Sequence, residues 1–257
     1  SKSCDNCGFC GAIVGSGSVV VTVQNFGVVD SYFGTNNGSV GGIVGRIDNY
    51  AKASFSKVYS YVSVYAHGSS AASGGLIGTV GQRAEVNLKN VYNCGSLVNK
   101  NSYVAGLIGF VMSYGVANIE NAYNVGSVSS PFTRSWKSLV ANNAGTLKMV
   151  NTYCVRINGR TELGGTPTSI EKFNNGMVAL ALHEGEGGSV WGQDVEKDEY
   201  PNFSGEVKNS VAKKYNVVFH TFEGDTASYF NFYTTGFTKD LPANVVQENA
   251  GFLGWYD

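Results

Sequence analysis

The residues that could do chemistry begin with a cysteine cluster near the start of the chain. Cys4, Cys7 and Cys10 follow one another at three-residue spacing, which can supply thiolates to a metal or form a disulfide. A tetrahedral zinc site needs a fourth ligand, and no histidine pair has ligand spacing among His67, His183 and His220. We therefore expect no metal site. A disulfide within the trio and small, buried thiols remain the open alternatives.

Carboxylates gather between Asp194 and Glu199. A calcium loop needs a central glycine and a ligand at its twelfth position, which this segment lacks, so we expect a solvated turn. Glycan-cleaving enzymes need carboxylates that converge in a groove. The acidic residues of the repeats are few and do not recur at matching positions (Asp30, Asp48, Glu85 and Glu120). The sequence therefore predicts no catalytic residues and no cofactor.

Aromatic side chains are the best candidates for ligand binding. Five of them crowd one short stretch: Tyr50, Phe55, Tyr59, Tyr61 and Tyr65. Exposed rings on a rigid face suit sugars or protein partners. The alternative is that they pack inward or stack as ladders. These five are our weak candidates for a binding site.

Bulk composition limits the elements that can position these residues. The 18 Lys and Arg against 19 Asp and Glu leave a net charge of -1, whereas nucleic-acid binding needs a basic surface. The 34 Gly among 43% hydrophobic residues indicate short strands joined by tight turns. No apolar run reaches the ~18 residues of a membrane span, so we expect no direct membrane insertion.

An internal repeat organises the first 160 residues or so. A motif of two small residues, two aliphatic residues and glycine starts at residues 11, 41, 74, 105 and 137, at separations of 30, 33, 31 and 32. Its copies are Gly11–Gly15, Gly41–Gly45, Gly74–Gly78, Ala105–Gly109 and the worn Lys137–Ala141. Short apolar segments at this period predict a β-solenoid, because one coil cannot bury its apolar face alone.

A second motif places tyrosine after asparagine, in Asn90–Gly95, Asn121–Gly126, Asn151–Val155 and, more weakly, Lys57–Tyr61. Three short strands and three corners account for one repeat. Stacked coils would align Tyr59, Tyr92, Tyr123 and Tyr153 in one column and Ile43, Leu76, Leu107 and Leu139 in another, with steps of about 4.8 Å. Whether the tyrosines point inward stays open.

Stacking also constrains the asparagines and the later cysteines. Asparagine at a corner can adopt the left-handed conformation and hydrogen-bond its equivalents in the neighbouring coils. Cys94 and Cys154 lie two repeats apart, about 9.6 Å along the stack, whereas a disulfide needs a Cα separation of about 5.5–6 Å. We expect both to stay thiols and to be at least partly buried.

The Gly-Gly-Ile-Val-Gly and Asn-x-Tyr-Asn-x-Gly-Ser-Val pattern resembles the GLUG-motif repeats of bacterial surface proteins, over roughly residues 8 to 160. That family occurs in large secreted adhesins and in non-catalytic regions of some surface peptidases. The resemblance implies an adhesin-like role without naming a ligand. The departures are the 33-residue second repeat, with its aromatic insert, and the degenerate fifth copy.

The rest of the chain reads as two smaller parts. Apolar spacing predicts one helix from about residue 168 to 187, weakened by Gly176, which would cap the last coil together with Trp191. Further on, a strand from Tyr215, Leu241-Pro242 and the run Gly251–Tyr256 resemble the Listeria–Bacteroides repeat, which is related to internalin B-repeats. That resemblance implies a small β-grasp-like module whose last strand is missing.

We therefore predict an all-β chain with three parts. They are a right-handed parallel β-solenoid of about five ~31-residue repeats (1–165), a capping helix with its closing segment (166–210), and a β-grasp-like module (211–257). The predicted function is adhesion, stalk or display by a monomeric, non-catalytic fragment of a bacterial cell-surface protein. It would be extracellular, with signal and anchor outside this fragment, and bind glycans or proteins but not nucleic acid. The alternatives are a carbohydrate-binding module of a larger enzyme and, less favoured, a polysaccharide-cleaving β-helix enzyme.

Overall fold

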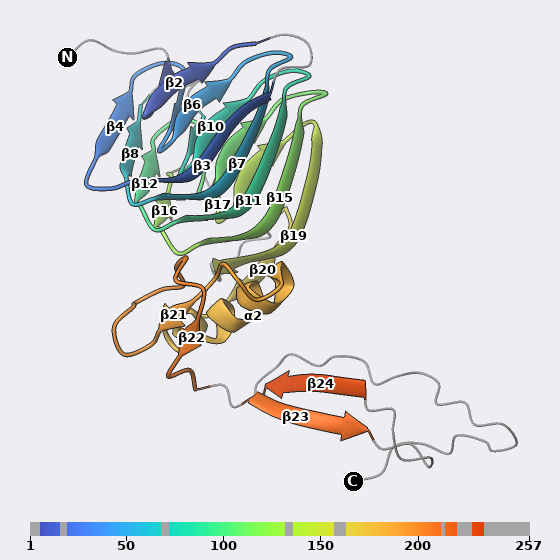
Figure 1. Ribbon diagram of the computed structural model, residues 1–257. Coiled ribbons are helices and arrows are strands. Elements are labelled where there is room, and N and C mark those ends of the chain that lie inside the picture. The colour runs from blue at the N-terminus through green and yellow to red at the C-terminus, as the bar shows by residue number, and fades with distance from the viewer. Residues whose placement is uncertain are drawn as a thin grey trace, which may run out of the picture.

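The computed structural model describes residues 6–15, 20–67, 72–131, 136–156 and 163–211, and the backbone of 214–219 and 228–233. Within these ranges, short parallel strands stack coil upon coil as a β-solenoid of about four turns (Figure 1). The predicted all-β solenoid is therefore confirmed.

Each of the first four coils contributes one strand to each of four parallel sheets. Sheet A contains β1 (Asn6–Cys7), β5 (Ser39–Gly41), β9 (Ser73–Gly74), β13 (Val104–Ala105) and β17 (Trp136–Lys137). Sheet B contains β2 (Cys10–Ile13), β6 (Val44–Ile47), β10 (Ile77–Val80), β14 (Ile108–Val111) and β18 (Val140–Asn143). Sheet C contains β3 (Val20–Val28), β7 (Lys52–Ser60), β11 (Glu85–Asn93), β15 (Val116–Asn124), β19 (Thr146–Val155) and β20 (Thr166–Thr168). Sheet D contains β4 (Tyr32–Thr35), β8 (Ser63–Ala66), β12 (Leu97–Asn99) and β16 (Val128–Ser129).

The coil has four strands, where the sequence predicted three. The glycine motif does not form a single strand. In the second coil, Gly42 and Ile43 make a bend that separates β5 of sheet A from β6 of sheet B. The fifth set of strands lacks a described member in sheet D.

The strand register corrects the first copy of the glycine motif. Val44, Ile77, Ile108 and Val140 pair in sequence as predicted, but the residue paired with Val44 is Cys10 rather than Val14. The first copy is therefore centred four residues earlier than the sequence indicated. Cysteine behaves as a small apolar residue and takes the place of an aliphatic one in this column.

Apolar columns run through the stacked coils and form the core. Ile43, Leu76, Leu107 and Leu139 are each at most 2% exposed, and successive members are joined by backbone hydrogen bonds of 3.0 to 3.1 Å. The predicted aliphatic column is therefore confirmed. Burial of such side chains is the main favourable contribution to folding.

The tyrosine column is also confirmed, and it lies outside this core. The rings of Tyr59, Tyr92 and Tyr123 stack nearly parallel, with centroids 5.1 and 5.0 Å apart. Val91, the neighbour of Tyr92, belongs to the core cluster, so the tyrosine side chain points away from the solenoid interior. The orientation that the sequence left open is thus resolved.

Each long strand of sheet C bends at one left-handed residue. These residues have φ between 50° and 55°, and they are Asn25, Lys57, Asn90, Asn121 and Asn151. Asparagine tolerates this conformation better than most residues, which confirms the predicted corner role. The bend resets the alternation of side chains, so that Leu88 and Val91, three residues apart, both face the core.

The two sequence motifs meet inside a corner of the coil. A Cβ added at Gly106 would lie 2.0 Å from Cγ of Asn124, and one at Gly75 would lie 2.4 Å from Cγ of Asn93. Nδ2 of Asn93 in turn donates a 2.8 Å hydrogen bond to Oδ1 of Asn124. The asparagine side chains therefore occupy the space that the glycines leave free.

In the described part of the chain, two helices follow the solenoid, where the sequence predicted one. They are α1 (Ile170–Asn174) and α2 (Met177–Glu186), and they are separated by Gly176 at φ 85°. Gly187, at φ 103°, ends α2. Phe173 is buried as expected, but Ile170, expected on the same face, is the first residue of α1 and is 44% exposed.

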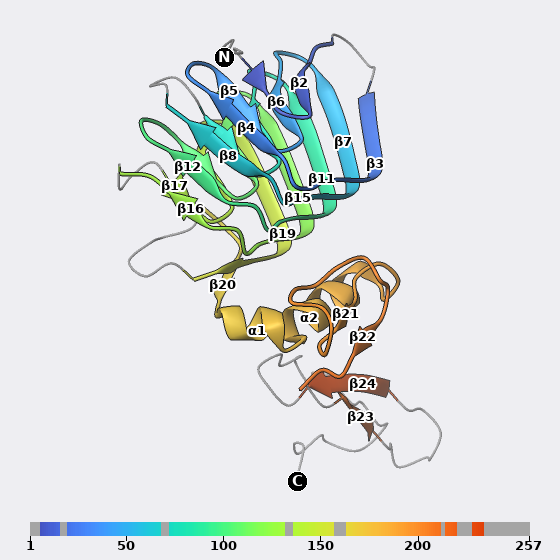
Figure 2. The ribbon, with the colours of Figure 1, turned by 90° about the vertical axis from the view of Figure 1, so that its left-hand side faces the viewer.

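These helices lie beside the end of the solenoid that carries β19 and β20 (Figure 2). Helix α2 contacts β19 and β15, and Phe173, Leu182 and Trp191 form a second buried cluster with Tyr92 and Tyr123. This cluster covers the outside of sheet C. A further pair of short strands, β21 (Gln193–Asp194) and β22 (Val207–Lys208), closes the segment.

The first coil is less well covered than the others. Phe9 is 64% exposed, whereas Ile43, which occupies the same place one coil later, is 2% exposed. Val21 is 39% exposed, and its strand partner Ala53 is fully buried. An apolar hollow of about 160 Å³ lies here.

The last described strands are β23 (Lys214–Phe219) and β24 (Ser228–Tyr233), which pair antiparallel. The Leu241-Pro242 and Gly251–Tyr256 parts of the predicted C-terminal module lie outside the described residues. Among the described residues, no helix is both long and apolar enough to cross a membrane.

Candidate functional site

A polar face lies on the outside of sheet C, ahead of its bend. In β11, Val86 and Leu88 point into the core while Glu85, Asn87 and Lys89 alternate with them and point outward. We call the outward side chains of this part of sheet C, across β7, β11, β15 and β19, the polar face. Because the strands pair in register, each type of outward position forms a row along the stack.

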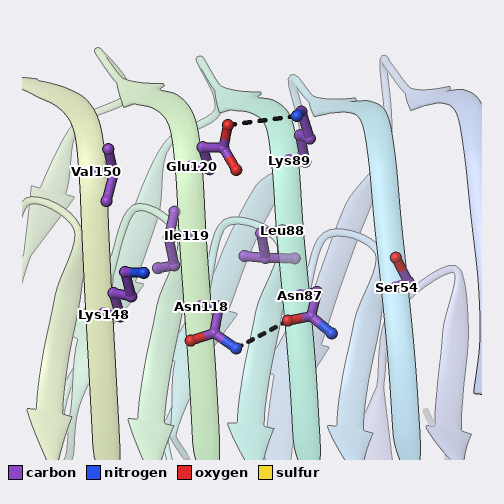
Figure 3. Close-up of a pocket in the computed structure, with 9 residues that line it drawn as sticks. All are labelled: Ser54, Asn87, Leu88, Lys89, Asn118, Ile119, Glu120, Lys148 and Val150. Atoms are coloured by element: carbon purple, nitrogen blue, oxygen red, sulfur yellow. Dashed lines mark hydrogen bonds and ion pairs between the residues drawn. The ribbon is translucent and has the colours of Figure 1, made fainter. Parts of the chain in front are cut away.

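The polar face contains a hollow of about 650 Å³, shown in Figure 3. Its lining comes from four strands: Ser54, Asn87, Leu88, Lys89, Asn118, Ile119, Glu120, Lys148 and Val150. Leu88 and Ile119 are core residues, almost fully buried, so the exposed part of the lining comes from the polar side chains and from Val150, which is 48% exposed.

The polar side chains of the hollow are partly paired with one another. Nδ2 of Asn118 donates a 2.9 Å hydrogen bond to Oδ1 of Asn87, and Nζ of Lys89 lies 3.3 Å from Oε1 of Glu120 (Figure 3). Each amide keeps further donor or acceptor capacity, since a side-chain amide has two donors and an acceptor with two lone pairs. The hollow can therefore offer hydrogen bonds of both kinds to a polar ligand.

One carboxylate lines the hollow in the described part of the chain, and it belongs to Glu120. Hydrolysis of a glycosidic bond normally needs two carboxyl groups on either side of the bond. The lining thus suits binding better than cleavage.

An aromatic and cationic cluster marks the corner that leads into the polar face. The guanidinium of Arg83 lies 5.5 Å from the ring centroid of Tyr50 and 5.6 Å from that of Tyr114, and it donates a hydrogen bond to the Tyr50 hydroxyl. The rings of Tyr50 and Tyr114 are 52% and 75% exposed. All three residues have φ between 56° and 64°, so they occupy the same corner of successive coils.

The structure separates the five aromatic residues proposed from the sequence. Tyr50 lies at the corner of the polar face, but Phe55 is 1% exposed inside the core and is unavailable to a ligand. Tyr59 and Tyr61 lie at the start of the tyrosine column, and Tyr61 is 43% exposed. Tyr65 lies on sheet D, where its hydroxyl is 2.7 Å from Nε2 of His67.

The tyrosine column is an internal cluster rather than a binding surface over most of its length. Tyr123 is fully buried, and its hydroxyl donates a 2.5 Å hydrogen bond to the carbonyl of Pro201. Burial raises the pKa of Tyr92 and of Tyr123 above the ordinary value, and it raises the pKa of the Cys94 thiol to about 11. These groups therefore stay protonated at neutral pH.

The other chemical candidates from the sequence are placed as follows. Cys7 is disulfide-bonded, Cys4 lies outside the described residues, and Cys94 and Cys154 carry thiols, as expected for the later pair. The described residues hold no group of three His, Cys, Asp or Glu side chains arranged for a metal ion.

The acidic segment after α2 is a turn. The amide of Lys197 donates to the Asp194 carbonyl at 2.9 Å, and the Asp194 amide donates to Oδ2 of Asp198 at 2.8 Å. Hydrogen bonds from the side chains of Lys197 and Asn209 lower the pKa of Asp194. The carboxylates of Asp194 and Asp198 thus have partners within the turn and beside it.

Sequence reasoning missed most of the polar face. Asn87, Asn118, Lys148 and Arg83 were not selected, because each looks like an ordinary surface residue when read alone. The available signal was the alternation of polar and apolar residues in Glu85–Lys89 and Val116–Glu120 at one repeat's distance. That signal becomes a site only when the register of the strands is known.

Comparison of the chain with protein-family models, with curated proteins and with solved structures finds no match.

Proposed function

We propose that this chain is a non-catalytic part of an extracellular bacterial cell-surface protein whose solenoid displays a glycan-binding face. The observation that carries the proposal is the hollow on the polar face, where amide, hydroxyl and charged groups are held in fixed rows by the strand register. A rigid surface of this kind binds without a large ordering cost.

The likeness of the repeats to GLUG motifs supports the surface location. It also supports five repeats, of which the worn last copy forms the incomplete coil. We infer a capping role for α1, α2 and the segment before them. In support, β20 pairs with β19, and the backbone at Gly165 lies against Leu139 of the last coil. The β23–β24 hairpin supports a small β module of the β-grasp kind.

A glycan fits the polar face better than a protein partner does. Protein interfaces rely on apolar anchors that fill well-packed pockets. The hollow instead presents Ser54, Asn87 and Asn118, whose polar groups match the hydroxyls of a sugar. The exposed ring of Tyr50 at the corner adds a surface on which a sugar can pack.

A binding assay with a chemical readout tests this proposal. The purified chain is applied to immobilised polysaccharides and matrix proteins, and each bound spot is then tested for newly released sugar ends. We expect saturable retention on glycan without release. Release of sugar ends would overturn the non-catalytic assignment, and retention on protein alone would overturn the glycan assignment.

A double variant locates the site. Replacing Asn87 and Asn118 together by alanine removes both the donor and the acceptor of the hydrogen bond between them. Neither side chain then remains without its hydrogen-bond partner. We expect glycan affinity to fall at least about tenfold, which corresponds to about 1.4 kcal/mol. Asn36→Ala, at an exposed corner between β4 and β5, is the matched control. Equal retention of the double variant and the control would exclude the hollow as the site.

The carbohydrate-binding module of a larger enzyme is the second candidate. The exposed aromatic pair Tyr50 and Tyr114 favours it. Strong retention on a structural polysaccharide, lost in a Tyr50→Ala and Tyr114→Ala variant, would support this role over adhesion.

A further inference from the structure

The charges on the polar face do not balance. Lys52 pairs with Glu85 at 3.2 Å, and Lys89 pairs with Glu120 at 3.3 Å. Two cations remain, Arg83 at the corner and Lys148 in the hollow, and neither has a carboxylate partner among the described residues. The face with its corner thus carries four cations and two carboxylates, whereas the whole chain carries a net charge of -1.

We propose that the ligand of the polar face is an acidic glycan, whose carboxylate or sulfate groups are selected by Arg83 and Lys148. This inference rests on the proposed function, because it assumes that the polar face binds a glycan. It adds the chemical class of the ligand and the two residues that recognise it.

Arg83 is prepared for this role by its two aromatic neighbours. Its guanidinium lies between the rings of Tyr50 and Tyr114, and one of its five donors is used by the Tyr50 hydroxyl. The remaining donors can meet a carboxylate or sulfate with the two-pronged geometry that guanidinium favours. Because the rings restrict the side chain, less conformational entropy is lost when an anion binds.

Lys148 supplies a second cation at a different place on the face. It lies in the row that contains Asn87 and Asn118, two strands along the stack from Asn87. Two strand spacings correspond to about 9.6 Å, and the corner of Arg83 lies several residues further along the strand direction. A single acidic sugar cannot reach both cations, so the ligand must be a chain of several sugar residues.

Selectivity for acidic chains follows from the environment of these charges. The face is open to solvent, so each ion pair with a ligand is weak on its own and is screened by salt. Two such contacts together still favour an acidic chain over a neutral one of the same shape. The amide row supplies the hydrogen bonds that both chains share.

The test compares a polyuronate with the same polymer after its carboxyl groups have been reduced to alcohols. We expect the native chain to bind the polyuronate at least about tenfold more tightly, with the difference shrinking as salt is added. Arg83→Gln and Lys148→Gln should each reduce this preference several-fold, and the double variant should abolish it. Arg83→Lys should retain part of it, because the charge remains but the fork is lost.

Lys172→Gln is the matched control, because it makes the same change of charge on the exposed surface of α1, away from the polar face. Near-ultraviolet circular dichroism of each variant checks that the fold is retained. If Lys172→Gln lost as much of the preference for the polyuronate as Lys148→Gln, the inference would be overturned. The preference would then depend on the total charge of the protein and not on the polar face.

The two levels of the proposal fail in different ways. In one outcome, both polymers bind equally, Arg83→Gln and Lys148→Gln change nothing, and the Asn87 and Asn118 double variant weakens binding. This would reject the acidic ligand and keep the glycan-binding face. Binding of neither polymer, in parallel with no retention on any other glycan, would reject both.

Discussion

The indole Nε1 of Trp191 donates a 3.0 Å hydrogen bond to Oδ1 of Asn90, which lies 101 positions earlier in the chain. Trp191 is fully buried, and Asn90 is the residue at which β11 bends. One side chain therefore links the bend of the solenoid to the segment that covers it.

Replacing Asn90 by alanine should destabilise the protein by about 2–5 kcal/mol. The variant leaves a buried indole donor without its acceptor, which costs about 1–3 kcal/mol, and places alanine in the left-handed conformation, which costs about 1–2 kcal/mol. Asn90→Gly separates the two causes, because glycine adopts that conformation without strain.

Urea unfolding followed by tryptophan fluorescence measures these differences. Asn25 is the matched control, since it has φ 51° at the equivalent bend of the first coil but an exposed side chain. Asn25→Ala should show only the backbone cost. Equal losses in the two alanine variants would mean that the hydrogen bond to Trp191 contributes nothing.

Tyr123→Phe should cost about 1–3 kcal/mol, although it removes a single oxygen atom. The ring stack with Tyr92 survives, but the carbonyl of Pro201 loses a buried donor. Tyr114→Phe, in which the exposed hydroxyl has no such role, should stay within about 0.5 kcal/mol of the native protein. Urea unfolding of the two variants measures this difference. Equal unfolding free energies for Tyr123→Phe and Tyr114→Phe would show that the hydrogen bond to Pro201 does not stabilise the fold.

The stability of the fold should fall in alkaline solution. Burial raises the pKa of Tyr123 and Tyr92, that of Cys94 to about 11 and that of Tyr200 to about 12. Above pH ~9 for the thiol and ~10 for the tyrosines, the unfolded chain therefore releases protons that the folded chain still holds, and unfolding becomes more favourable as pH rises. Below pH ~9 the ionisation of these groups should no longer change the stability with pH.

Unfolding free energies measured at a series of alkaline pH values check this expectation. Replacing Tyr123 by phenylalanine removes one titrating group from the folded cluster, so the variant should lose less stability with each pH unit than the native chain. A native chain whose stability stays constant through pH 11 would contradict the burial of these hydroxyls.

The last coil suggests a test of the packing between glycine and asparagine. Where earlier coils have Gly106 and Asn124, the last coil has the buried residues Ser138 and Cys154 at the matching positions. Gly106→Ser alone should clash with Asn124 and cost about 1–3 kcal/mol or more. The double variant Gly106→Ser with Asn124→Cys should recover part of that loss.

A double-mutant cycle quantifies this coupling. Asn124→Cys alone also removes the hydrogen bond from Asn93, so its own cost must be measured. Strictly additive losses would show that the two positions do not compete for space.

The periodic part of the fold could be predicted from the sequence, because stacking requires equivalent residues in each coil. The columns of Leu76 and Tyr92 follow from spacing alone. The first coil was misaligned because Cys10 replaces the aliphatic residue that marks the motif in the other copies. A residue type that changes within a column is invisible until its strand partner is known.

The remainder depends on contacts between distant segments. Nothing near Trp191 in the sequence specifies Asn90 as its partner, so the packing of the helical segment on the outside of sheet C could not be read from periodicity. Of the five aromatic residues selected as binding candidates, only Tyr50 adjoins the polar face. The position of each bend decides whether a side chain faces the core or the solvent, and the sequence does not mark the bends clearly.

The coils differ in length, yet their columns do not drift. Successive paired residues in sheet B are 33, 31 and 32 positions apart, from Val44 through Ile77 and Ile108 to Val140. The extra residues fall between strands, so each coil still advances the stack by one strand whatever its length in residues. Corner segments can therefore lengthen, shorten or change sequence over evolutionary time while the rows of the polar face keep the spacing that an extended polymer would meet.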